Sequence, residues 1–335
     1  MSAAGTPATM PAVVTDGHGG PEVLRVEERP VPVPGAGEVL VHVAATAVNR
    51  ADTLQALGHY PPPAGVTDIL GLEFAGEVVS VGPDTATSLI GRRVMGIVPG
   101  GGNAEYVTIP ADQVIPVPDA LTWEQAAATP EVFLTAFHSI VRLGRASAGD
   151  RVLVHSASSG VGSAGVQIAR EVGAEVIATS RSAERLAPAT DAGAHGIVVT
   201  DGEFAGAVRE ITGGHGVDVI LDLVGAAYWR DNVLSLARLG RLVLTGMVGG
   251  RRTELDLAPL YAAHATVIAT TLRARPASEK AALVTEFIDW GLPRLADGRL
   301  VPVIDRVLPL AQVADAHRAL TENTVVGKIV LLIRP

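Results

Sequence analysis

The sequence is 335 residues long, 48% apolar and 18% charged, with a net charge of −9 at pH 7. The acidic charge disfavours a nucleic-acid partner, and the complete lack of cysteine excludes disulfides, thiolate zinc sites and a cysteine nucleophile. No apolar run reaches the roughly 20 residues that span a membrane, and the first residues lack a basic and apolar leader, so we expect a cytoplasmic protein.

The first part of the chain, from Pro11 to about Ala120, is predicted to be rich in β-structure. The run from Glu38 to Val43 alternates partly between apolar and polar residues, which is typical of a strand with one face inward. Because the apolar runs are short and separated by Gly, Pro and Asp, we expect a small, partly open β-barrel. Its expected strands cover residues 11–15, 23–26, 38–44, 74–81 and 93–97.

The pattern changes at Leu121, where a helix is expected. Thr122 followed by Gln125 predicts a capping box, and Pro130 indicates that this helix ends and another begins. Strands and helices then alternate, and the strands are mostly apolar, which predicts a parallel sheet buried on both faces in a doubly wound α/β domain. The expected strands are 151–156, 175–179, 196–199, 217–223 and 241–245, and the expected helices are 161–172 and 182–192.

The C-terminal segment contains two expected helices, at 278–290 and 310–321, and two expected strands, at 305–308 and 328–333. We expect its last helix and strand to return to the first lobe, so that one domain is discontinuous in sequence. The predicted domains are a catalytic β-barrel at 1–125, a nucleotide-binding domain at 126–270, and a return to the catalytic domain at 271–335.

A loop of small residues joins the first strand of the α/β domain to its first helix. Small residues let the backbone approach a pyrophosphate, and a helix N-terminus offers free N–H groups and the positive end of the helix dipole. A literal GxGxxG pattern falls on Gly160, Gly162 and Gly165, but it places two glycines inside the helix. The register Ala157-x-Ser159-x-x-Gly162 begins directly after the strand, where a dinucleotide site requires it. The alternative is a helix that only packs on the sheet.

The end of the second strand of this domain favours NADP(H) over NAD(H). An NAD site usually has an Asp or Glu there to hold the ribose 2′-hydroxyl. This chain has Ser180, Arg181 and Ser182, with Arg185 one helical turn later. Hydroxyl and guanidinium groups suit a 2′-phosphate. The alternative is that the two arginines are solvated surface charges, and the nearby Glu184 argues against a phosphate.

Several segments together resemble the medium-chain dehydrogenase/reductase superfamily over almost the whole chain. Within it the sequence is similar to the zinc-free quinone oxidoreductases, especially the branch that includes the p53-inducible quinone oxidoreductase. The resemblance implies a GroES-like catalytic lobe, a Rossmann lobe and a C-terminal return. It is carried by the phosphate loop and by residues 49–55, 58–61, 71–76, 133–136, 246–250, 271–273 and 327–331.

The resemblance also implies that the enzyme works without zinc. Zinc-dependent relatives carry a Gly-His-Glu metal motif, and the histidine position here is Leu72, followed by Glu73. Their early cysteine ligand corresponds to about Asn49. Without a Lewis acid, deprotonating an alcohol is hard, whereas reducing a quinone or an activated C=C bond is easier. We interpret Glu73 as a buried, paired carboxylate of the family scaffold rather than as a general base.

Two residues are implied to lie at the reaction site. Asn49 would sit beside the nicotinamide and hydrogen-bond the cofactor or the substrate oxygen; alternatively it only caps a turn. Tyr60 would lie near the substrate entrance and orient a quinone or supply a proton; alternatively it only closes the rim. The chain departs from some relatives by having Leu54 and Thr200 at positions that carry tyrosine there. The cofactor contacts, from the resemblance and the arguments above, are Asn49, Thr135, Ser158, Ser159, Gly160, Val161, Gly162, Ser180, Arg181, Arg185, Gly246, Met247, Leu272 and Arg273.

Three functions are compatible with these features. The first is an NADPH-dependent reductase of quinones or α,β-unsaturated carbonyl compounds. The second is an enoyl-thioester reductase of a polyketide or acyl pathway, because the apolar Leu54 and the small side chains around Gly58 would admit a longer acyl chain. The third is a non-catalytic NADPH-binding protein. By family analogy we also expect a homodimer formed through the apolar strand at 265–271, because an unpaired strand edge recruits a partner.

Overall fold

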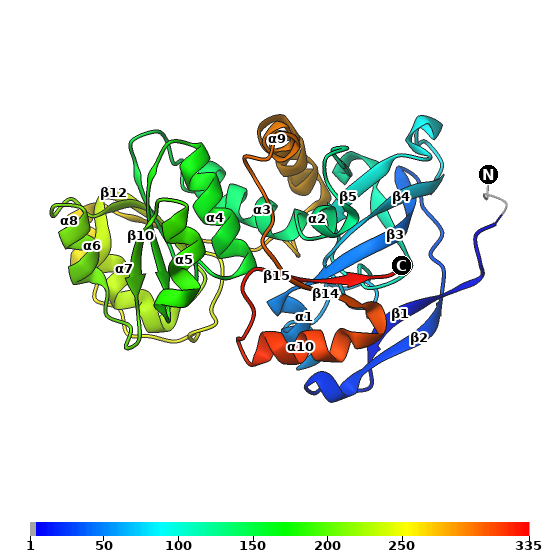
Figure 1. The fold of residues 1–335 in the computed structure, drawn as a ribbon, viewed down its shortest axis with the longest axis horizontal. Coiled ribbons are helices and arrows are strands. Elements are labelled where there is room, and N and C mark those ends of the chain that lie inside the picture. The colour runs from blue at the N-terminus through cyan, green and yellow to red at the C-terminus, as the bar shows by residue number, and fades with distance from the viewer. Residues whose placement is uncertain (1–4, 335) are drawn as a thin grey trace. The chain divides into compact units, whose positions relative to one another are not determined.

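The computed structural model describes residues 5–334 of the chain. These residues form two compact units: one runs up to Glu131 and resumes at Leu272, and the other runs from Val132 to Thr271. Figure 1 shows the helices and strands of both units in chain order.

The first unit is built on a seven-stranded sheet in the order β14-β15-β3-β4-β5-β7, with β6 also paired to β3 and a separate β1-β2 pair. Strand β15 runs antiparallel to β3, with Ile329 opposite Val48, so the C-terminal segment completes a sheet begun near the N-terminus. The strands are β1 (Thr9–Thr15), β2 (Leu24–Pro30), β3 (Glu38–Val48), β4 (Glu73–Val81), β5 (Arg93–Ile97), β6 (Tyr106–Pro110), β7 (Ile115–Pro116), β14 (Ile304–Pro309) and β15 (Lys328–Leu332).

The expectation that β3 has only one face inward is wrong, because the strand is buried along almost its whole length. Val41 packs on one side in a cluster that includes Phe74. Leu40 packs on the other side in a second cluster that includes Met10 and Ala12 of β1. The two-stranded β1-β2 element thus contributes to a second apolar layer, which the partial alternation of the sequence did not indicate.

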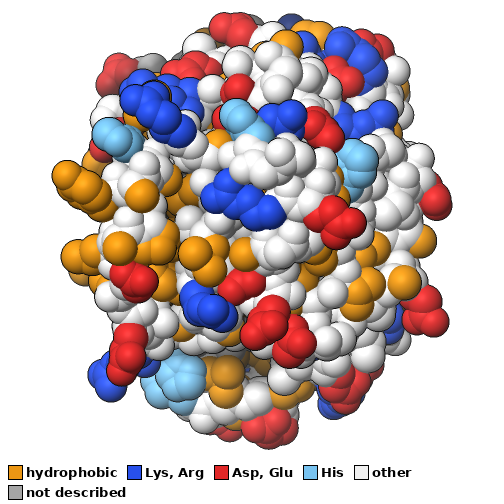
Figure 2. Space-filling model, turned by 90° about the vertical axis from the view of Figure 1, so that its left-hand side faces the viewer, with side chains coloured by type: hydrophobic (Ala, Val, Ile, Leu, Met, Phe, Trp, Pro, Cys, Tyr) orange, Lys and Arg blue, Asp and Glu red, His pale blue; other side chains and the backbone are white. Residues whose placement is uncertain are grey.

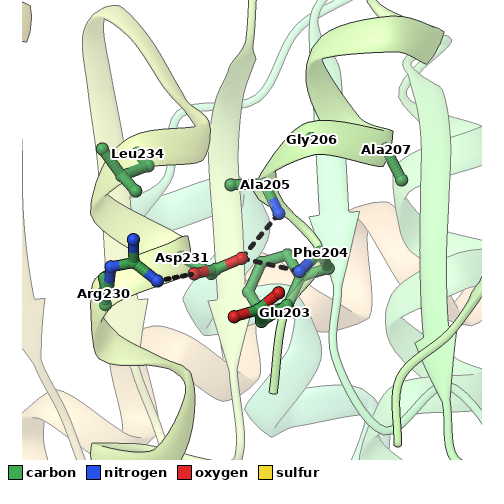
Figure 3. Close-up of a pocket in the computed structure, with 8 residues that line it drawn as sticks. All are labelled: Glu203, Phe204, Ala205, Gly206, Ala207, Arg230, Asp231 and Leu234. Carbon is green, nitrogen blue, oxygen red and sulfur yellow. Dashed lines mark hydrogen bonds and ion pairs between the residues drawn. The ribbon is translucent and has the colours of Figure 1, made fainter. Parts of the chain in front are cut away.

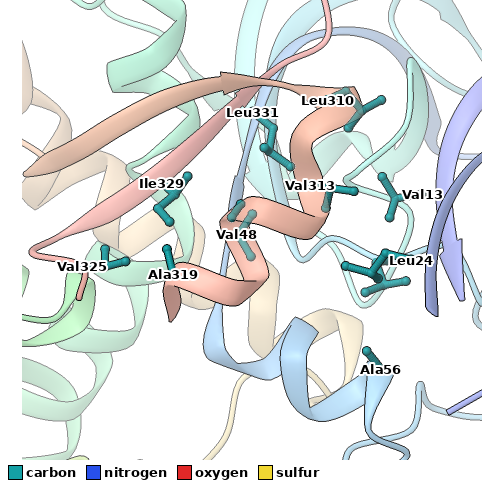
Figure 4. Close-up of a cluster of buried hydrophobic side chains, with 12 residues drawn as sticks. Val13, Leu24, Val48, Ala56, Leu310, Val313, Ala319, Val325, Ile329 and Leu331 are labelled. Atoms are coloured by element: carbon teal, nitrogen blue, oxygen red, sulfur yellow. The ribbon is translucent and has the colours of Figure 1, made fainter. Parts of the chain in front are cut away.

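The helices of the first unit are α1 (Arg50–Ala56), α2 (Trp123–Ala127), α9 (Ala277–Ala296) and α10 (Val313–Thr321). The predicted capping box of α2 is confirmed: the Gln125 N–H donates to Thr122 Oγ1 at 3.3 Å, and the Thr122 N–H donates to Gln125 Oε1 at 3.0 Å. Figure 4 shows how α10 packs on the sheet through Val313 and Ala319, against Leu24 and other buried side chains. Each fully buried Val or Leu in such a cluster contributes about 1.5–3 kcal/mol.

The second unit is a six-stranded parallel sheet in the order β10-β9-β8-β11-β12-β13. This is the doubly wound order of a Rossmann fold, and it confirms the predicted fold class. Helices α6, α7 and α8 contact one another in sequence, and Figure 1 shows them on the opposite side of the sheet from α4. The elements are β8 (Arg151–Val154), α4 (Gly160–Glu171), β9 (Glu175–Ser180), α5 (Ala183–Asp191), β10 (His195–Val198), α6 (Ala205–Ile211), β11 (Val217–Asp222), α7 (Trp229–Ser235), β12 (Leu236–Leu244), α8 (Ala258–Ala263) and β13 (Thr266–Ala269).

The central strands of this sheet are buried on both faces, as their apolar runs predict. Leu153 and Ile220 on one face, and Val152 and Val219 on the other, have no exposed surface. Helix α3 (Pro130–Phe137) begins at Pro130, where the sequence predicts a new helix. Within residues 5–334, none of the helices is both long and apolar enough to cross a membrane.

Candidate cofactor and active site

The loop after β8 has the form that the second register predicts. Helix α4 begins at Gly160, directly after Ser159, whose Oγ accepts a hydrogen bond from the Gly162 N–H at 3.0 Å. The N–H groups of Gly160 and Val161 have no acceptor inside the helix, because the first turn of any α-helix leaves its donors free. These donors and the helix dipole make the start of α4 a place where a pyrophosphate can bind.

Gly162 fixes how closely α4 approaches this loop. A Cβ atom on Gly162 would lie 2.1 Å from the Ser156 carbonyl oxygen and 2.8 Å from Ala157 Cα. Gly165 is less constrained, because the nearest atom to its Cβ would be a methyl group of the Leu221 side chain at 2.8 Å. A backbone atom moves less easily than the end of a side chain, so Gly162 is the residue that the close packing requires.

Ser180 and Arg185, two of the residues predicted to contact a 2′-phosphate, lie together with Ser158 of the loop after β8. Ser158 Oγ is 3.4 Å from Ser180 Oγ, and Arg185 Nε donates to Ser158 Oγ at 3.3 Å. Arg181 and Glu184 are both exposed. The structure therefore gathers two hydroxyl groups and one guanidinium in the second unit and leaves the competing carboxylate in solvent.

A buried chain of polar side chains supports the neighbouring loop. His155, fully buried, lies with Nδ1 2.8 Å from Thr179 Oγ1 and Nε2 2.6 Å from Asn232 Oδ1, and burial lowers its pKa to about 4. Because Asn232 donates its Nδ2 hydrogen to Asp222 Oδ2, its Oδ1 accepts from His155. Asp222 in turn accepts the N–H of Gly225. His155 is thus neutral, and both of its ring nitrogens have partners within the unit.

The other predicted contacts of the second unit follow strand ends or lie on α3. Gly246 donates its N–H to the Asp222 carbonyl oxygen at 3.1 Å, and Met247 beside it is half exposed. Thr135 is buried in α3. In doubly wound sheets ligands bind at the carboxyl ends of the strands, where Gly246 and Met247 lie.

In the first unit, Asn49 caps helix α1 and is tightly bound by its neighbours. Its Nδ2 group donates to Glu73 Oε1 at 2.9 Å and to the Ala47 carbonyl oxygen at 3.2 Å. Its Oδ1 accepts a hydrogen bond from Lys328 Nζ at 2.5 Å. Both amide hydrogens are therefore used within the unit, and the free hydrogen-bonding capacity of Asn49 is the second lone pair of Oδ1.

Lys328 binds both Asn49 and Glu73 and so fixes their side chains. The sequence did not indicate this role. Its ammonium donates to Glu73 Oε1 at 2.7 Å, to Asn49 Oδ1 and to the Val48 carbonyl oxygen at 3.0 Å. The side chains of Glu73 and Lys328 are 0% and 4% exposed. The interpretation of Glu73 as a buried, paired carboxylate is thus confirmed, and the Gly327-Lys328 pair near the C-terminus was the available signal.

Two more carboxyl groups lie near this ion pair. Asp52 is fully buried; its Oδ2 accepts the Asn49 N–H at 2.7 Å, its Oδ1 has no hydrogen-bond partner among the described residues, and burial raises its pKa to about 6. Glu131 donates its N–H to Glu73 Oε2 at 2.9 Å. Burial, and next the charge of Glu73, raises the pKa of the Glu131 carboxyl to about 8.

Tyr60 and Arg273 lie together in the first unit. The Arg273 guanidinium, 5.1 Å from the centre of the Tyr60 ring, donates to the carbonyl oxygens of Pro99 and Tyr60 and to Gln55 Oε1. It therefore holds the Tyr60 segment in place. A phosphate contact by this guanidinium would have to displace these partners, and the cofactor contacts of Arg273 and of the buried Leu272 stay predictions.

A pocket of about 390 Å³ lies elsewhere in the second unit, beside the start of α6 (Figure 3). Asp231 fills the anion-binding position there, because its Oδ2 accepts the N–H groups of Phe204 and Ala205 at 2.6 and 2.8 Å. None of the predicted site residues lines it. The candidate groups are therefore the α4 loop in the second unit and the Asn49 cluster in the first unit.

The donor groups fit a nicotinamide dinucleotide and do not fit zinc. The first turn of α4 has free N–H groups. It packs so closely on the preceding loop that residue 162 has to be glycine. In the part of the chain that the structure describes, no three His, Cys, Asp or Glu side chains are grouped to hold a metal ion. Leu72, at the position of the metal-binding histidine, is buried and apolar.

Two family models match the chain. One is described as an alcohol dehydrogenase GroES-like domain and matches residues 35–119; the other is described as a zinc-binding dehydrogenase and matches residues 160–289. The chain is also 35% identical over 303 residues to the mycocerosic acid synthase-like polyketide synthase of Mycobacterium tuberculosis, an alignment that covers 89% of this chain. It spans only 14% of that relative's length.

Solved structures resemble the chain along almost its full length. An NAD-dependent alcohol dehydrogenase is 33% identical with a TM-score of 0.86, over 97% of this chain and 100% of its own. Two mycobacterial structures, a quinone oxidoreductase in its native form and a chain complexed with NADPH, are each 34% identical, with TM-scores of 0.82 and 0.85. Each covers 96% of this chain and 99% of its own.

Proposed function

Because the chain belongs to the medium-chain dehydrogenase/reductase family of nicotinamide-dependent oxidoreductases, we propose that it reduces quinones or α,β-unsaturated carbonyl compounds with NADPH and without zinc. The observation that carries this proposal is the combination of two features in one chain. The loop packed on Gly162 suits a dinucleotide. The apolar Leu72 stands at the position where zinc-dependent relatives have a metal-binding histidine. Hydride transfer to an already activated acceptor needs no Lewis acid.

Both units carry groups that would bind the cofactor. The N–H groups of Gly160 and Val161 would hold the pyrophosphate, and Thr135, Gly246 and Met247 would line the cofactor. When bound, the reduced nicotinamide supplies the hydride. Asn49 would accept a hydrogen bond from a cofactor hydroxyl or amide group through Oδ1, since both of its own amide hydrogens are already donated.

Tyr60 and Leu54 are the residues from which we infer the substrate class. The Tyr60 hydroxyl would orient the substrate oxygen. Leu54, 36% exposed, would give the entrance an apolar wall. The same wall, together with the polyketide synthase relative, supports the second candidate, reduction of an enoyl thioester.

A substrate panel separates these functions. We expect NADPH oxidation with 1,4-benzoquinone, 9,10-phenanthrenequinone and a simple enone. Turnover of crotonyl-CoA in strong preference to all three would move the protein to enoyl-thioester reduction. Tight NADPH binding without turnover of any acceptor would support the third candidate, a non-catalytic NADPH-binding protein.

We predict that Arg181 and Arg185 determine the choice of NADPH. Replacing both by alanine removes charged donors to the 2′-phosphate, each worth about 1.5–3 kcal/mol. We expect the Kd for NADPH, measured by fluorescence titration, to rise at least about tenfold while the Kd for NADH stays unchanged. The matched control is Arg170→Ala, which removes an exposed arginine of α4. Equal weakening of both nucleotides, or tighter binding of NADH by the wild type, would contradict the NADPH assignment.

We also propose a homodimer joined through β13. This strand is the last of its sheet and is largely exposed, and its Val267 is 39% exposed. Figure 2 shows one face of the molecule, on which hydrophobic side chains gather near one margin. Val267→Lys places a charge on this edge and should convert the dimer to a 34.4 kDa monomer in light scattering. Val198→Lys, on the opposite edge strand β10, should leave the dimer intact. A monomeric wild type at micromolar concentration would contradict the proposal.

A further inference from the structure

We propose that the Glu131 carboxyl group is the general acid that protonates the α-carbon of an enone or enoyl substrate. The inference rests on the proposed function, because it assigns the proton that must follow hydride addition to a conjugated C=C bond. It gives Tyr60 the task of orienting the substrate oxygen and gives the proton to a residue that the sequence did not indicate.

The geometry places Glu131 beside Asn49. The two oxygens of the Glu73 carboxylate each bind one of these residues: Oε1 accepts the Asn49 Nδ2 hydrogen and Oε2 accepts the Glu131 N–H, both at 2.9 Å. A single carboxylate therefore fixes the start of α3 next to the residue proposed to contact the cofactor. Glu131 is partly exposed as a residue, whereas Asp52 is fully buried.

The charges around Glu131 favour its protonated form. Its carboxyl group interacts electrostatically with Glu73 on β4, Asp52 on α1, Lys328 on β15 and Lys280 on α9, and also with Arg273. The ammonium of Lys328 already donates hydrogen bonds to Glu73, to Asn49 and to a carbonyl oxygen.

The two remaining cations are also directed elsewhere. Lys280 donates to the Arg273 carbonyl oxygen at 2.9 Å, and Arg273 itself donates to carbonyl oxygens and Gln55. Neither cation forms a direct ion pair with the Glu131 carboxyl group. With its pKa raised to about 8, Glu131 holds a proton at neutral pH, which is the state a general acid needs.

The proton balance of the step is simple. NADPH is the reductant; after hydride addition to the β-carbon, the substrate is an enolate. The Glu131 O–H bond breaks, a C–H bond forms at the α-carbon, and the resulting carboxylate takes a new proton from water. A quinone differs because its reduced form is protonated on oxygen, which water can do without help.

Glu131→Gln tests this assignment because it keeps the shape and removes the acid. With NADPH we expect kcat for the enone to fall about 100-fold, a typical general-acid contribution, while kcat for the quinone stays within about twofold. The wild-type enone rate should be flat below pH 8 and fall above it as Glu131 ionises, and the variant should lose this pH limb. The matched control is Glu124→Gln in the first turn of α2, another half-buried glutamate.

Two further measurements do not depend on the rate. In deuterated water the wild type should place deuterium on one face of the α-carbon, and Glu131→Gln should give both faces. In the cofactor-free protein, the infrared band of a protonated carboxyl should titrate near pH 8 and be absent from Glu131→Gln.

Full enone activity and one-sided labelling in Glu131→Gln, or their loss in Tyr60→Phe instead, would overturn the assignment. A missing infrared band would also overturn it. Failure of the proposed function is distinguishable, because the wild type would then reduce neither quinone nor enone.

Discussion

Gly162→Ala should weaken NADPH binding at least about 100-fold. The added methyl group would lie 2.1 Å from the Ser156 carbonyl oxygen, and both the oxygen and the backbone behind it belong to the loop that must cradle the pyrophosphate. The helix α4 and the loop therefore have to separate, which removes the alignment of the Gly160 and Val161 N–H groups. We expect the Kd for NADPH, measured by calorimetry, to rise by at least about 100-fold, since two charge-assisted hydrogen bonds of about 1.5 kcal/mol each are lost.

The control for this variant is Gly206→Ala in α6 of the same unit. A methyl group on Gly206 meets nothing within 4 Å, and alanine in a helix is favoured over glycine by about 1 kcal/mol. We therefore expect unchanged NADPH binding and equal or higher stability. If Gly162→Ala bound NADPH as tightly as Gly206→Ala, the α4 loop would not be the pyrophosphate site.

Lys328→Met should strongly destabilise the first unit. It leaves the Glu73 carboxylate buried without its cation, and breaking a buried pair in this way costs about 3–5 kcal/mol. The expected result is a fall of that size in the free energy of unfolding, measured by urea titration of the full chain. Asn49 would also lose the donor to its Oδ1, so NADPH binding should weaken.

Glu73→Gln combined with Lys328→Met removes the stranded charge but keeps an acceptor for Asn49 or Glu131. We expect the double variant to be more stable than Lys328→Met alone, because the penalty comes mainly from the uncompensated carboxylate. A double variant less stable than Lys328→Met would show that the lysine acts through packing and not through its charge.

The local structure around the candidate site could be predicted. The loop after β8, its register and the Thr122 capping box each lie within about ten residues, where small residues and cap signals act directly. The short helix α1 was missed, although Asn49 at its start was recognised as a possible cap. Seven residues give too little of a periodic pattern to separate a helix from a loop.

The buried charges could not be predicted, because their partners are distant in the chain. Lys328 and Glu73 are 255 residues apart, and the sequence around either residue does not indicate that the other is its partner. Lys280 and Lys328 are the only lysines in the sequence, and both prove to be buried in the first unit. Arg273 shows the converse, since its expected contact is a cofactor and its observed partners are Pro99, Tyr60 and Gln55.

The central claim is that this chain transfers a hydride from NADPH to carbon or oxygen of an activated acceptor. The most direct test is a single turnover with NADPH deuterated at C4 of the nicotinamide and an excess of enone, followed by mass analysis of the product. We predict one deuterium at the β-carbon of the reduced enone for each NADPH oxidised. NADPH that stays reduced in the complex, or product without the label, would contradict the claim.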